Sequence, residues 1–418
     1  MYDTLTIPDW QDQYLSKRFN YFEKTHKNNP EYLPPVTETK YSSNYLNLTS
    51  STNGLHWGIL YNVCFNIKHN KLFYYRKAGS EQQFTDSFYK DFGTLWTIVE
   101  EETISPISAH VEVSNDQWMI IPFAKRNIPH FAESHNFIIH YLMNQNDFPP
   151  MRVVYSPLYN TKTDNEWKLQ YIDSLKDLFP SPHQLDIYGL TEMMDMFNKG
   201  TVCFKQLNIA GKLDHITLGG IYLSYEESLY FKASVFRKYN IYPHIEKRFK
   251  TNGMLVLRNE QAIGQNPGRI IKNIEEVRSL FIEMNSFFTI SEVYLETLPF
   301  KIQVQRISET DILIGAHGAG LINIMYMIPN SVVIDIFPPL FDEKWYNELA
   351  DVNHIAFLSY HNFSAPYPQE CIDSSIINAN KQICITAIKS NNIHVNTNIL
   401  KALLVQARIY LSNHKFDI

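Results

Sequence analysis

The sequence predicts an α/β protein with two domains. Its 418 residues exceed the size of one typical domain, and each half is long enough to bury its own core. Short apolar runs alternate along the chain with segments whose apolar residues recur at helical spacing, the pattern of alternating strands and helices. In the second half the apolar runs are almost continuous, as expected for parallel strands covered on both faces.

The first half is interpreted as an N-terminal extension followed by a domain. Residues 1–45 are polar and interrupted by prolines, and we expect them to wrap around the body of the protein. In the domain, residues 46–245, two strands around a turn at 69–71 are predicted from GILYNVCFNIKHNKLFYYR. Buried strands are predicted from QWMIIPF and MRVVYS, and a helix from HFAESHNFIIHYLMNQ.

The second half alternates more regularly. After a connection at RKYNIYPHIEKRFKTNG, the predicted domain of residues 246–395 has strands at GMLVLRN, ISEVYLE, ILIGA and SVVIDIF. Helices are predicted from NIEEVRSLFIEM, LINIMYMI and KWYNELADVN, with a helix or mixed segment at FKIQVQRISETD. A C-terminal helix, residues 396–418, has an apolar face made of Leu400, Leu403, Leu404, Ala407 and Leu411.

Composition and charge exclude several classes of partner. A net charge of −6 gives no electrostatic reason to expect nucleic acid or an anionic membrane surface. No apolar run is long enough to span a membrane, and the first ten residues lack the features of a signal peptide. The chain is therefore expected to be soluble as given, which is also compatible with the trimmed catalytic part of an anchored protein.

The cysteines and the glycosylation sequons leave the cellular compartment open. The four cysteines include no Cys-x-x-Cys pair, so a zinc site is not expected. Cys371 and Cys384 flank a short polar stretch suited to a disulfide loop in an oxidising compartment, and four buried free thiols are an equal alternative. Sequons begin at Asn47 and Asn362, which favours the secretory pathway only slightly in so Asn-rich a chain.

The stretch ILIGAHGAGLIN, residues 312–323, places three of the chain's 15 glycines around His317. It lies at a predicted strand-to-helix junction, where parallel α/β proteins bind ligands. The start of a helix offers backbone N–H groups and a partial positive charge to a diphosphate, glycines let that backbone approach closely, and His317 can donate a hydrogen bond. A tight turn with a surface histidine is the alternative. The stretch matches neither the dinucleotide-binding nor the P-loop motif.

The wider segment TDILIGAHGAGLINIMYMIPNSVVIDIFP, residues 310–338, resembles the signature of glycosyltransferase family 61. The matching positions are Asp311, Gly315, His317, Gly318, Ala319, Gly320, Leu321, Asn323, Pro329, Ser331, Val333, Asp335 and Pro338. The stretch MLVLRNEQAIGQNPGRIIKNIEEV is similar to the family's segment with two arginines, here Arg258 and Arg269. Two further stretches, NVCFNIKHNKLFYY and GTVCFKQLNIAG, resemble family strands and place Cys64 and Cys203. The resemblance spans about residues 46–408 and is looser in the first domain.

The resemblance implies a fold and an activity. The fold is the GT-B arrangement, two facing Rossmann-like domains with a cleft between them, in which the first domain binds the acceptor and the second binds the nucleotide sugar. The activity is inverting transfer of a sugar from a UDP-sugar to a hydroxyl of a glycan or glycoprotein. Family members include xylosyltransferases and N-acetylglucosaminyltransferases, so xylose or GlcNAc is the expected sugar. The resemblance also implies the Golgi or ER lumen, with an N-terminal anchor absent from this chain and the cytoplasm as the alternative, and the disulfides Cys371–Cys384 and Cys64–Cys203.

The leaving diphosphate needs cations and dipoles, and the resemblance supplies candidates for both. Arg258 follows a predicted strand and suits bidentate phosphate binding, with a solvated arginine as the alternative. Arg269 is the second candidate, although it can equally pair with Glu275 or Glu276. Asp335 is expected to bind the ribose or to cap a loop. The expected nucleotide-sugar-binding residues are Arg258, Arg269, His317, Gly318, Ala319, Gly320, Leu321, Asn323 and Asp335.

The catalytic base is expected in the first domain. The stretch NIPHFAES resembles a family segment in which an acid follows a histidine by three or four residues, here Glu133 and His130. The two lie on one helical face, so either can be the base and the other can orient it, with capping and packing as the alternative. His110 and Glu112 are the next candidates. No Asp-x-Asp pair is present to hold a divalent ion on a diphosphate, so no metal or other cofactor is expected.

Two other functions compete with the glycosyltransferase. A catalytically inactive protein of the same fold would serve as a binding or scaffold protein, but the candidate arginines, histidine and acid are all present. An NAD(P)-dependent oxidoreductase would share the alternating pattern but would carry the dinucleotide-binding glycines, which this chain lacks.

Overall fold

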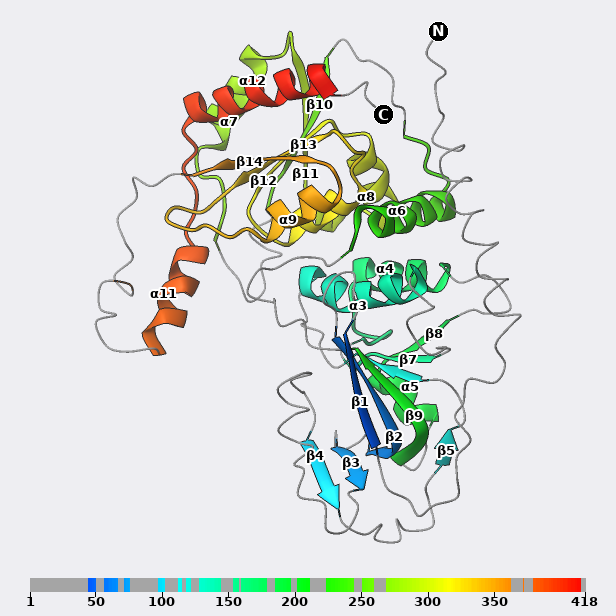
Figure 1. Ribbon diagram of the computed structural model, residues 1–418. Coiled ribbons are helices and arrows are strands. Elements are labelled where there is room, and N and C mark those ends of the chain that lie inside the picture. The colour runs from blue at the N-terminus through cyan, green and yellow to red at the C-terminus, as the bar shows by residue number, and fades with distance from the viewer. Residues whose placement is uncertain are drawn as a thin grey trace. The chain divides into compact units, whose positions relative to one another are not determined.

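The structure is a computed structural model of the whole chain (Figure 1). It describes residues 44–49, 56–66, 71–75, 97–101, 112–114, 118–121, 128–143, 153–157, 159–178, 185–196, 201–210, 223–243, 250–258, 268–361, 371 and 379–414. Almost all of the predicted N-terminal extension lies outside these residues. The chain divides into two compact units. Unit 1 comprises Met1–Thr217, Ile221–Leu223 and Ala233–Lys238, and unit 2 comprises Leu218–Gly220, Ser224–Lys232 and Tyr239–Ile418.

The sheet of unit 1 has nine strands of mixed direction. Its order is β4-β3-β2-β9-β6-β7-β8, with β1 paired to β2 and β5 to β9. Strands β6 to β9 form a parallel part, whereas β1, β3 and β9 each run antiparallel to β2. The antiparallel part departs from the parallel Rossmann-like sheet that was predicted. The bounds are β1 Asn44–Thr49, β2 His56–Asn66, β3 Lys71–Tyr75, β4 Thr97–Glu101, β5 Glu112–Ser114, β6 Trp118–Ile120, β7 Val153–Tyr155, β8 Asp186–Tyr188 and β9 Thr201–Ala210.

Three helices of the described residues lie wholly in unit 1: α3 (Ile128–Met143), α4 (Glu166–Lys176) and α5 (Leu190–Met196). Helix α3 tolerates Pro129 because a first-turn N–H has no partner inside a helix. The predicted helix is confirmed, and its apolar residues Phe131, Phe137, Ile138 and Tyr141 are buried. The core of the sheet is formed by apolar side chains of β2, β6, β7 and β9.

Unit 2 contains a five-stranded, wholly parallel sheet in the order β11-β10-β12-β13-β14. The bounds are β10 Thr251–Val256, β11 Phe288–Val293, β12 Ile312–Ala316, β13 Val332–Ile336 and β14 Ala356–Tyr360. The first four confirm the predicted strands. Strands β12 and β13 are buried at every position, as the continuous apolar runs indicated.

The helices of unit 2 cover both faces of this sheet (Figure 1), with α7 and α12 on one side and α8 and α9 on the other. Leu400, Leu404, Ala407 and Leu411 of α12 are buried in the same core as Val277 of α7. The predicted helix LINIMYMI is a 3-10 helix, η3, and α6 was not predicted. The bounds are α6 Tyr225–Tyr239, α7 Ile274–Glu283, η2 Leu295–Thr297, α8 Phe300–Ser308, η3 Ala319–Tyr326, α9 Trp345–Val352, α11 Ala379–Lys389 and α12 Thr397–His414.

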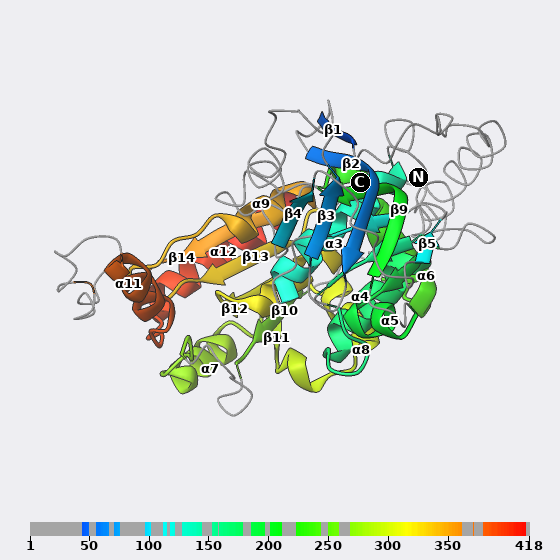
Figure 2. The same ribbon diagram turned by 90° about the horizontal axis from the view of Figure 1, so that it is seen from below.

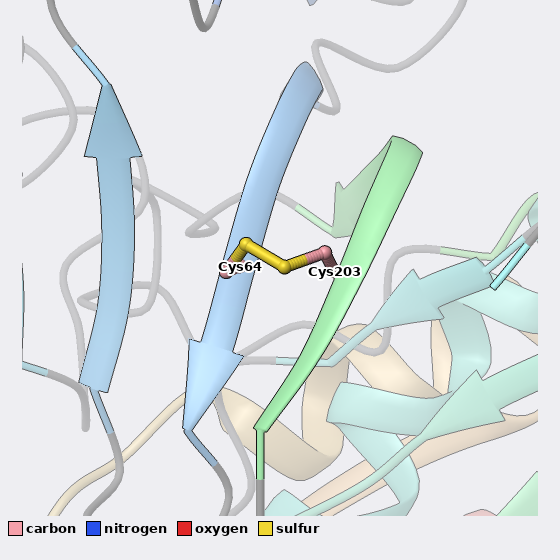
Figure 3. Close-up of a disulfide and its surroundings, with 2 residues drawn as sticks. All are labelled: Cys64 and Cys203. Carbon is pink, nitrogen blue, oxygen red and sulfur yellow. A yellow bond between two sulfur atoms is a disulfide. The ribbon is translucent and has the colours of Figure 1, made fainter. Parts of the chain in front are cut away.

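Both predicted cysteine pairs are bonded in the structure. Cys64 on β2 and Cys203 on β9 lie directly opposite each other in the antiparallel ladder, and their side chains join the two strands (Figure 3). Cys371 is bonded to Cys384 of α11. No cysteine is free, so the alternative of four free thiols is wrong for this structure.

The structure describes only one of the two predicted glycosylation sites. Asn47 lies on β1, and Asn362 lies outside the described residues. Within the described part of the chain, no helix combines the length and the apolar character that crossing a membrane requires.

Candidate functional site

The strand order of unit 2 creates a switch point between β10 and β12. From β10 the chain continues to β11 on one side, and from β12 it continues to β13 on the other (Figure 2). Ligands of open parallel sheets bind at such a point, outside the carboxyl ends of the strands. Arg258 follows β10 by two residues and His317 follows β12 directly, and Val256 pairs with Gly315 in the ladder. The register therefore brings both predicted residues to the same edge.

Two guanidinium groups lie against the backbone of Gly318. A Cβ atom on this glycine would lie 2.9 Å from Nη1 of Arg258 and 3.3 Å from Nη1 of Arg269. Burial, together with the neighbouring charge of Arg269, lowers the pKa of Arg258 to about 10. Burial also lowers the pKa of Arg269. Two half-buried cations that repel each other favour an anion between them.

Arg269 is held in an unusual backbone conformation. Its φ is 61°, in the left-handed region, and Gly268 before it has a φ of 92°. Non-glycine residues pay of order 1 kcal/mol or more for this conformation, and such residues cluster at functional sites. A Cβ on Gly268 would overlap the carbonyl oxygen of Ser390, so this position requires glycine.

The segment that follows α11 supports this conformation. Arg269 N–H donates to the Asn391 carbonyl at 3.1 Å, and Ile393 N–H donates to the Ile270 carbonyl at 2.9 Å. The Arg269 side chain then reaches across, and its Nη1 donates to the carbonyl oxygen of His317 at 3.0 Å. The alternative partner Glu275 is paired with Arg278, and Glu276 accepts a hydrogen bond from Asn273.

His317 is buried, and both of its ring nitrogens face carboxylates. Nδ1 lies 2.9 Å from Oδ2 of Asp335 and Nε2 lies 3.3 Å from Oε2 of Glu343. Burial alone would lower the pKa of His317, but the two carboxylates outweigh burial and raise it. The ring is stacked on Phe337 and meets the edges of Phe341 and Tyr346. In this arrangement both hydrogen-bonding positions of the ring are already occupied by protein groups.

Asp335, the candidate for binding the ribose, faces His317 from the interior of the protein. It is completely buried on β13, with Oδ2 against His317 and with Oδ1 lacking any hydrogen-bond partner among the described residues. Burial raises the pKa of Asp335, and His317 opposes that rise. The structure therefore places Asp335 behind His317, where it orients the imidazole.

Glu343 and Lys389 complete the cluster and were not predicted from the sequence. Glu343 lies between β13 and α9, with Oε2 3.4 Å from Nζ of Lys389 at the end of α11. Pairing with His317, aided by Lys389 and opposed by burial, lowers the pKa of Glu343 to about 2. Neither residue belongs to a motif, and only their tertiary neighbours reveal them.

The remaining residues of the glycine-rich stretch divide into two groups. Gly318, Ala319 and Gly320 form the turn into η3, and Tyr346 donates a hydrogen bond to the Gly318 carbonyl at 2.5 Å. Leu321 and Asn323 are buried, and Asn323 donates to the Gly320 carbonyl at 3.0 Å. These two side chains therefore stabilise the turn from inside unit 2. Among the described residues there is no group of three or more His, Cys, Asp or Glu side chains arranged for a metal ion.

Unit 1 contains the predicted histidine and acid in contact. His130 Nδ1 lies 2.8 Å from Oε2 of Glu133, one turn apart on α3. The Glu133 side chain is only 6% exposed, whereas that of His130 is 29% exposed. Oε1 of Glu133 is buried and has no hydrogen-bond partner within the described residues. One carboxylate oxygen therefore contacts the histidine, while the other is buried without a partner among the described residues. His110 lies outside the described residues, and Glu112 is on β5.

A second buried histidine fixes the helix that carries this pair. His135 faces the Phe131 carbonyl through Nδ1 at 2.7 Å and Ser156, after β7, through Nε2 at 2.9 Å. Burial lowers the pKa of His135 to about 4, so it is neutral at physiological pH. Tyr171 of α4 donates to Asn136 at 2.5 Å. These buried hydrogen bonds hold α3 against β7 and α4.

Comparison with known proteins identifies the family of the chain. The family model of Glycosyltransferase 61 matches residues 101–334, which include α3, Arg258, Arg269 and His317. The chain is also 33% identical over 89 residues to the EGF domain-specific O-linked N-acetylglucosamine transferase of Drosophila melanogaster, over 21% of this chain and 17% of that protein. The match therefore spans less than a fifth of the relative's length. Because the family model covers more than half of the chain, the protein belongs to glycosyltransferase family 61.

Proposed function

We propose that this protein is an inverting glycosyltransferase that moves a sugar from a UDP-sugar to a hydroxyl of a glycan or glycoprotein. The observation that carries the proposal is the pair of half-buried guanidinium groups, Arg258 and Arg269, on the Gly318 backbone at the switch point of a parallel sheet. This is the place and the chemistry that a nucleoside diphosphate requires.

The proposed reaction divides the work between the two units. The acceptor hydroxyl oxygen attacks the anomeric carbon while the bond from that carbon to the diphosphate breaks. Arg258 and Arg269 stabilise the negative charge that develops on the leaving diphosphate. The Glu133 carboxylate takes the hydroxyl proton, and His130 orients that carboxylate through its contact with Oε2. The GT-B arrangement belongs to this proposal, because it lets both units act on one donor.

The sugar is proposed to be GlcNAc or xylose. The relative's name describes transfer of GlcNAc to a protein domain, which supports GlcNAc and a glycoprotein acceptor. Xylose comes from the family resemblance alone. Metal-independent transfer is part of the proposal and is supported by the cationic side chains at the switch point, which perform the charge stabilisation that a divalent ion would otherwise supply.

The proposed location is the lumen of the ER or Golgi. Two disulfides, one of them within the core sheet of unit 1, are typical of proteins from oxidising compartments. Peptide mapping of the protein from its native source without reductant should recover Cys64–Cys203 and Cys371–Cys384 as linked peptides. Recovery of four free thiols would instead support the cytoplasm.

The test is a panel of nucleotide sugars measured in two ways. UDP-GlcNAc or UDP-xylose should raise the Tm of the protein and should release UDP slowly by hydrolysis, because a ligand that binds only the native state stabilises it. GDP-mannose and NADPH should do neither. Binding without release of UDP, even with an acceptor library, would support an inactive binding protein. No response to any UDP-sugar would contradict the proposal.

A further inference from the structure

The imidazole of His317 is the one ring at the switch point whose two nitrogens both face carboxylates within the described residues. Its distances are 2.9 Å from Nδ1 to Asp335 and 3.3 Å from Nε2 to Glu343. A neutral imidazole carries only one N–H, so it would present a lone pair to one of the two carboxylates. An imidazolium donates from both nitrogens and satisfies both.

We propose that Glu343 is a positioning residue that, together with Asp335, holds His317 as an imidazolium, so that His317 acts as a fixed cation of the candidate diphosphate site. The proposal deepens the proposed function and rests on it for the identity of the ligand. It changes the role expected for His317. The ring supplies charge and orients its own backbone, while the arginines contact the phosphates.

The geometry leaves the ring little freedom to turn. The His317 side chain is 6% exposed, lies between Phe337 and Tyr346, and is anchored on one side by a carboxylate that is completely buried. The His317 backbone accepts the hydrogen bond from Arg269 and donates one to the Ile336 carbonyl. A change in the charge of this ring therefore acts on the position of Arg269 as well as on the local potential.

The surrounding charges come from every element packed around the ring. Asp335 is on β13, Glu343 and Tyr346 lie before and within α9, and Arg269 precedes α7. Lys389 ends α11 and pairs with Glu343, and His361, after β14, lies close enough to lower the pKa of Asp335. With His317 protonated, the four cations Arg258, Arg269, His317 and Lys389 still exceed the three carboxylates Asp335, Glu343 and Glu296, the last of which lies near Arg258. The excess of positive charge suits a doubly negative diphosphate.

A competing role for Glu343 makes the opposite prediction. Glu343 is half-exposed, with 42% of its side chain accessible, and it is an anion at a site proposed for anions. If it only occupied the place of the diphosphate, its neutralisation would strengthen nucleotide binding. If it holds the proton on His317, its neutralisation weakens nucleotide binding above the pH at which His317 then titrates.

The test uses Glu343→Gln, with Asp342→Asn as the matched control. Asp342 is the exposed neighbour and makes the same carboxylate-to-amide change. The first measurement follows the ring protons of His317 by NMR between pH 5 and 9 without ligand. Glu343→Gln should move the titration of His317 to lower pH, and Asp342→Asn should leave it in place. An unchanged titration in Glu343→Gln would overturn the proposal.

The second measurement is the Kd of UDP at pH 5.5 and 8. Glu343→Gln should weaken UDP binding by about ten-fold at pH 8, the effect of roughly one pKa unit of coupling, and much less at pH 5.5. Tighter binding at pH 8 would show that Glu343 is only a competing anion. If the unmodified protein binds no UDP, the proposed function fails, and the titration without ligand still decides whether Glu343 holds the proton.

Discussion

In unit 1 the candidate base comes from one turn of α3, because Glu133 and His130 are three residues apart and touch through a single contact of 2.8 Å. In unit 2 the candidate diphosphate site is assembled from distant segments. Arg258 and Arg269 meet at Gly318, and His317 is 18 residues from Asp335 in sequence. The first group needs only a helix, whereas the second needs the order and register of three strands and the segment after α11.

This difference predicts which substitutions disrupt each group of residues. A substitution outside α3 should leave the His130–Glu133 contact intact as long as unit 1 folds, since helical spacing alone creates it. The unit 2 cluster should respond to changes far from the ligand, because Arg269 depends on Asn391 and His317 depends on Asp335. The experiments below are ordered from the largest expected effect to the smallest.

Glu133→Gln should have the largest effect. It removes the proton acceptor without changing side-chain volume, so kcat should fall by about 10²–10⁴-fold, the usual contribution of a general base. UDP binding should be unchanged, because the proposed donor site is in unit 2. His130→Ala should be similarly severe, and the double variant little worse than either single one, if the two act together.

The control for this variant is Asp195→Asn, which makes the same chemical change at an exposed position of α5. It should keep full activity. A Glu133→Gln enzyme that retains more than about a tenth of the normal kcat would place the base elsewhere, since the loss would be well below that of a general base.

Arg258→Ala should reduce kcat by about 10²-fold, the scale expected when one charge-stabilising donor is lost. His317→Ala should cost a similar factor, because it removes a cation and the buried ring that fixes the backbone carbonyl to which Arg269 donates. Arg306→Ala, an exposed arginine on α8, is the control for removing a positive charge. Rates near normal in both site variants at saturating donor would exclude this cluster as the diphosphate site.

Gly318→Ala should have an intermediate effect. It disturbs the cluster of unit 2 and leaves the His130–Glu133 pair of unit 1 unchanged. Its backbone is extended, with a φ of 161°, so alanine fits the main chain. The new Cβ would displace the Nη1 atoms of Arg258 and Arg269. We expect the KM for the donor to rise about ten-fold, the loss of one well-placed charged hydrogen bond. Gly320→Ala, whose Cβ would lie 3.4 Å from Val256, should cost less. Equal effects of both would refute the steric argument.

Lys232→Met should change stability and not chemistry. Lys232 of α6 is completely buried and donates to the Met327 carbonyl at 2.5 Å, where η3 ends. Burial lowers the pKa of Lys232 to about 7. Between pH 7 and the usual lysine pKa the unfolded chain binds more protons than the folded one, so the stability of the unmodified protein should rise with pH in this window.

The methionine variant should lack that rise. The free energy of unfolding can be measured in urea at pH 6 and at pH 10. Between these values it should rise in the unmodified protein by on the order of 2 kcal/mol or more relative to the methionine variant, since one pKa unit corresponds to about 1.4 kcal/mol. If the two unfolding free energies depend on pH in the same way, burial does not lower the pKa of Lys232 in the folded protein.

Chelation should have the smallest effect on catalysis. Activity should survive EDTA, because the cations at the switch point are protein side chains. Loss of activity in EDTA that Mn²⁺ restores would mean that the diphosphate is held by a metal ion in addition to the arginines.

Much of unit 2 could be predicted from the sequence because its inner strands β12 and β13 are buried at every position and have continuous apolar runs. The edge strand β11 is partly exposed, but all of β10, β11, β12 and β13 were expected near their observed positions because segments with helical spacing separate them. The mixed sheet of unit 1 was less predictable, since short strands such as β5 and β8 have only three residues each and give little periodicity.

The sequence by itself determined the family, the contact between His130 and Glu133, and the presence of cations near the glycine-rich turn. These follow from residues close together in the chain, where helix spacing and motif order leave few alternatives. The tertiary structure alone decided that Asp335 turns toward His317, that Glu343 occupies the other ring nitrogen, and that Arg269 adopts a left-handed backbone. Those contacts join residues 18 to 122 positions apart, and they depend on strand order and register, which no local pattern specifies.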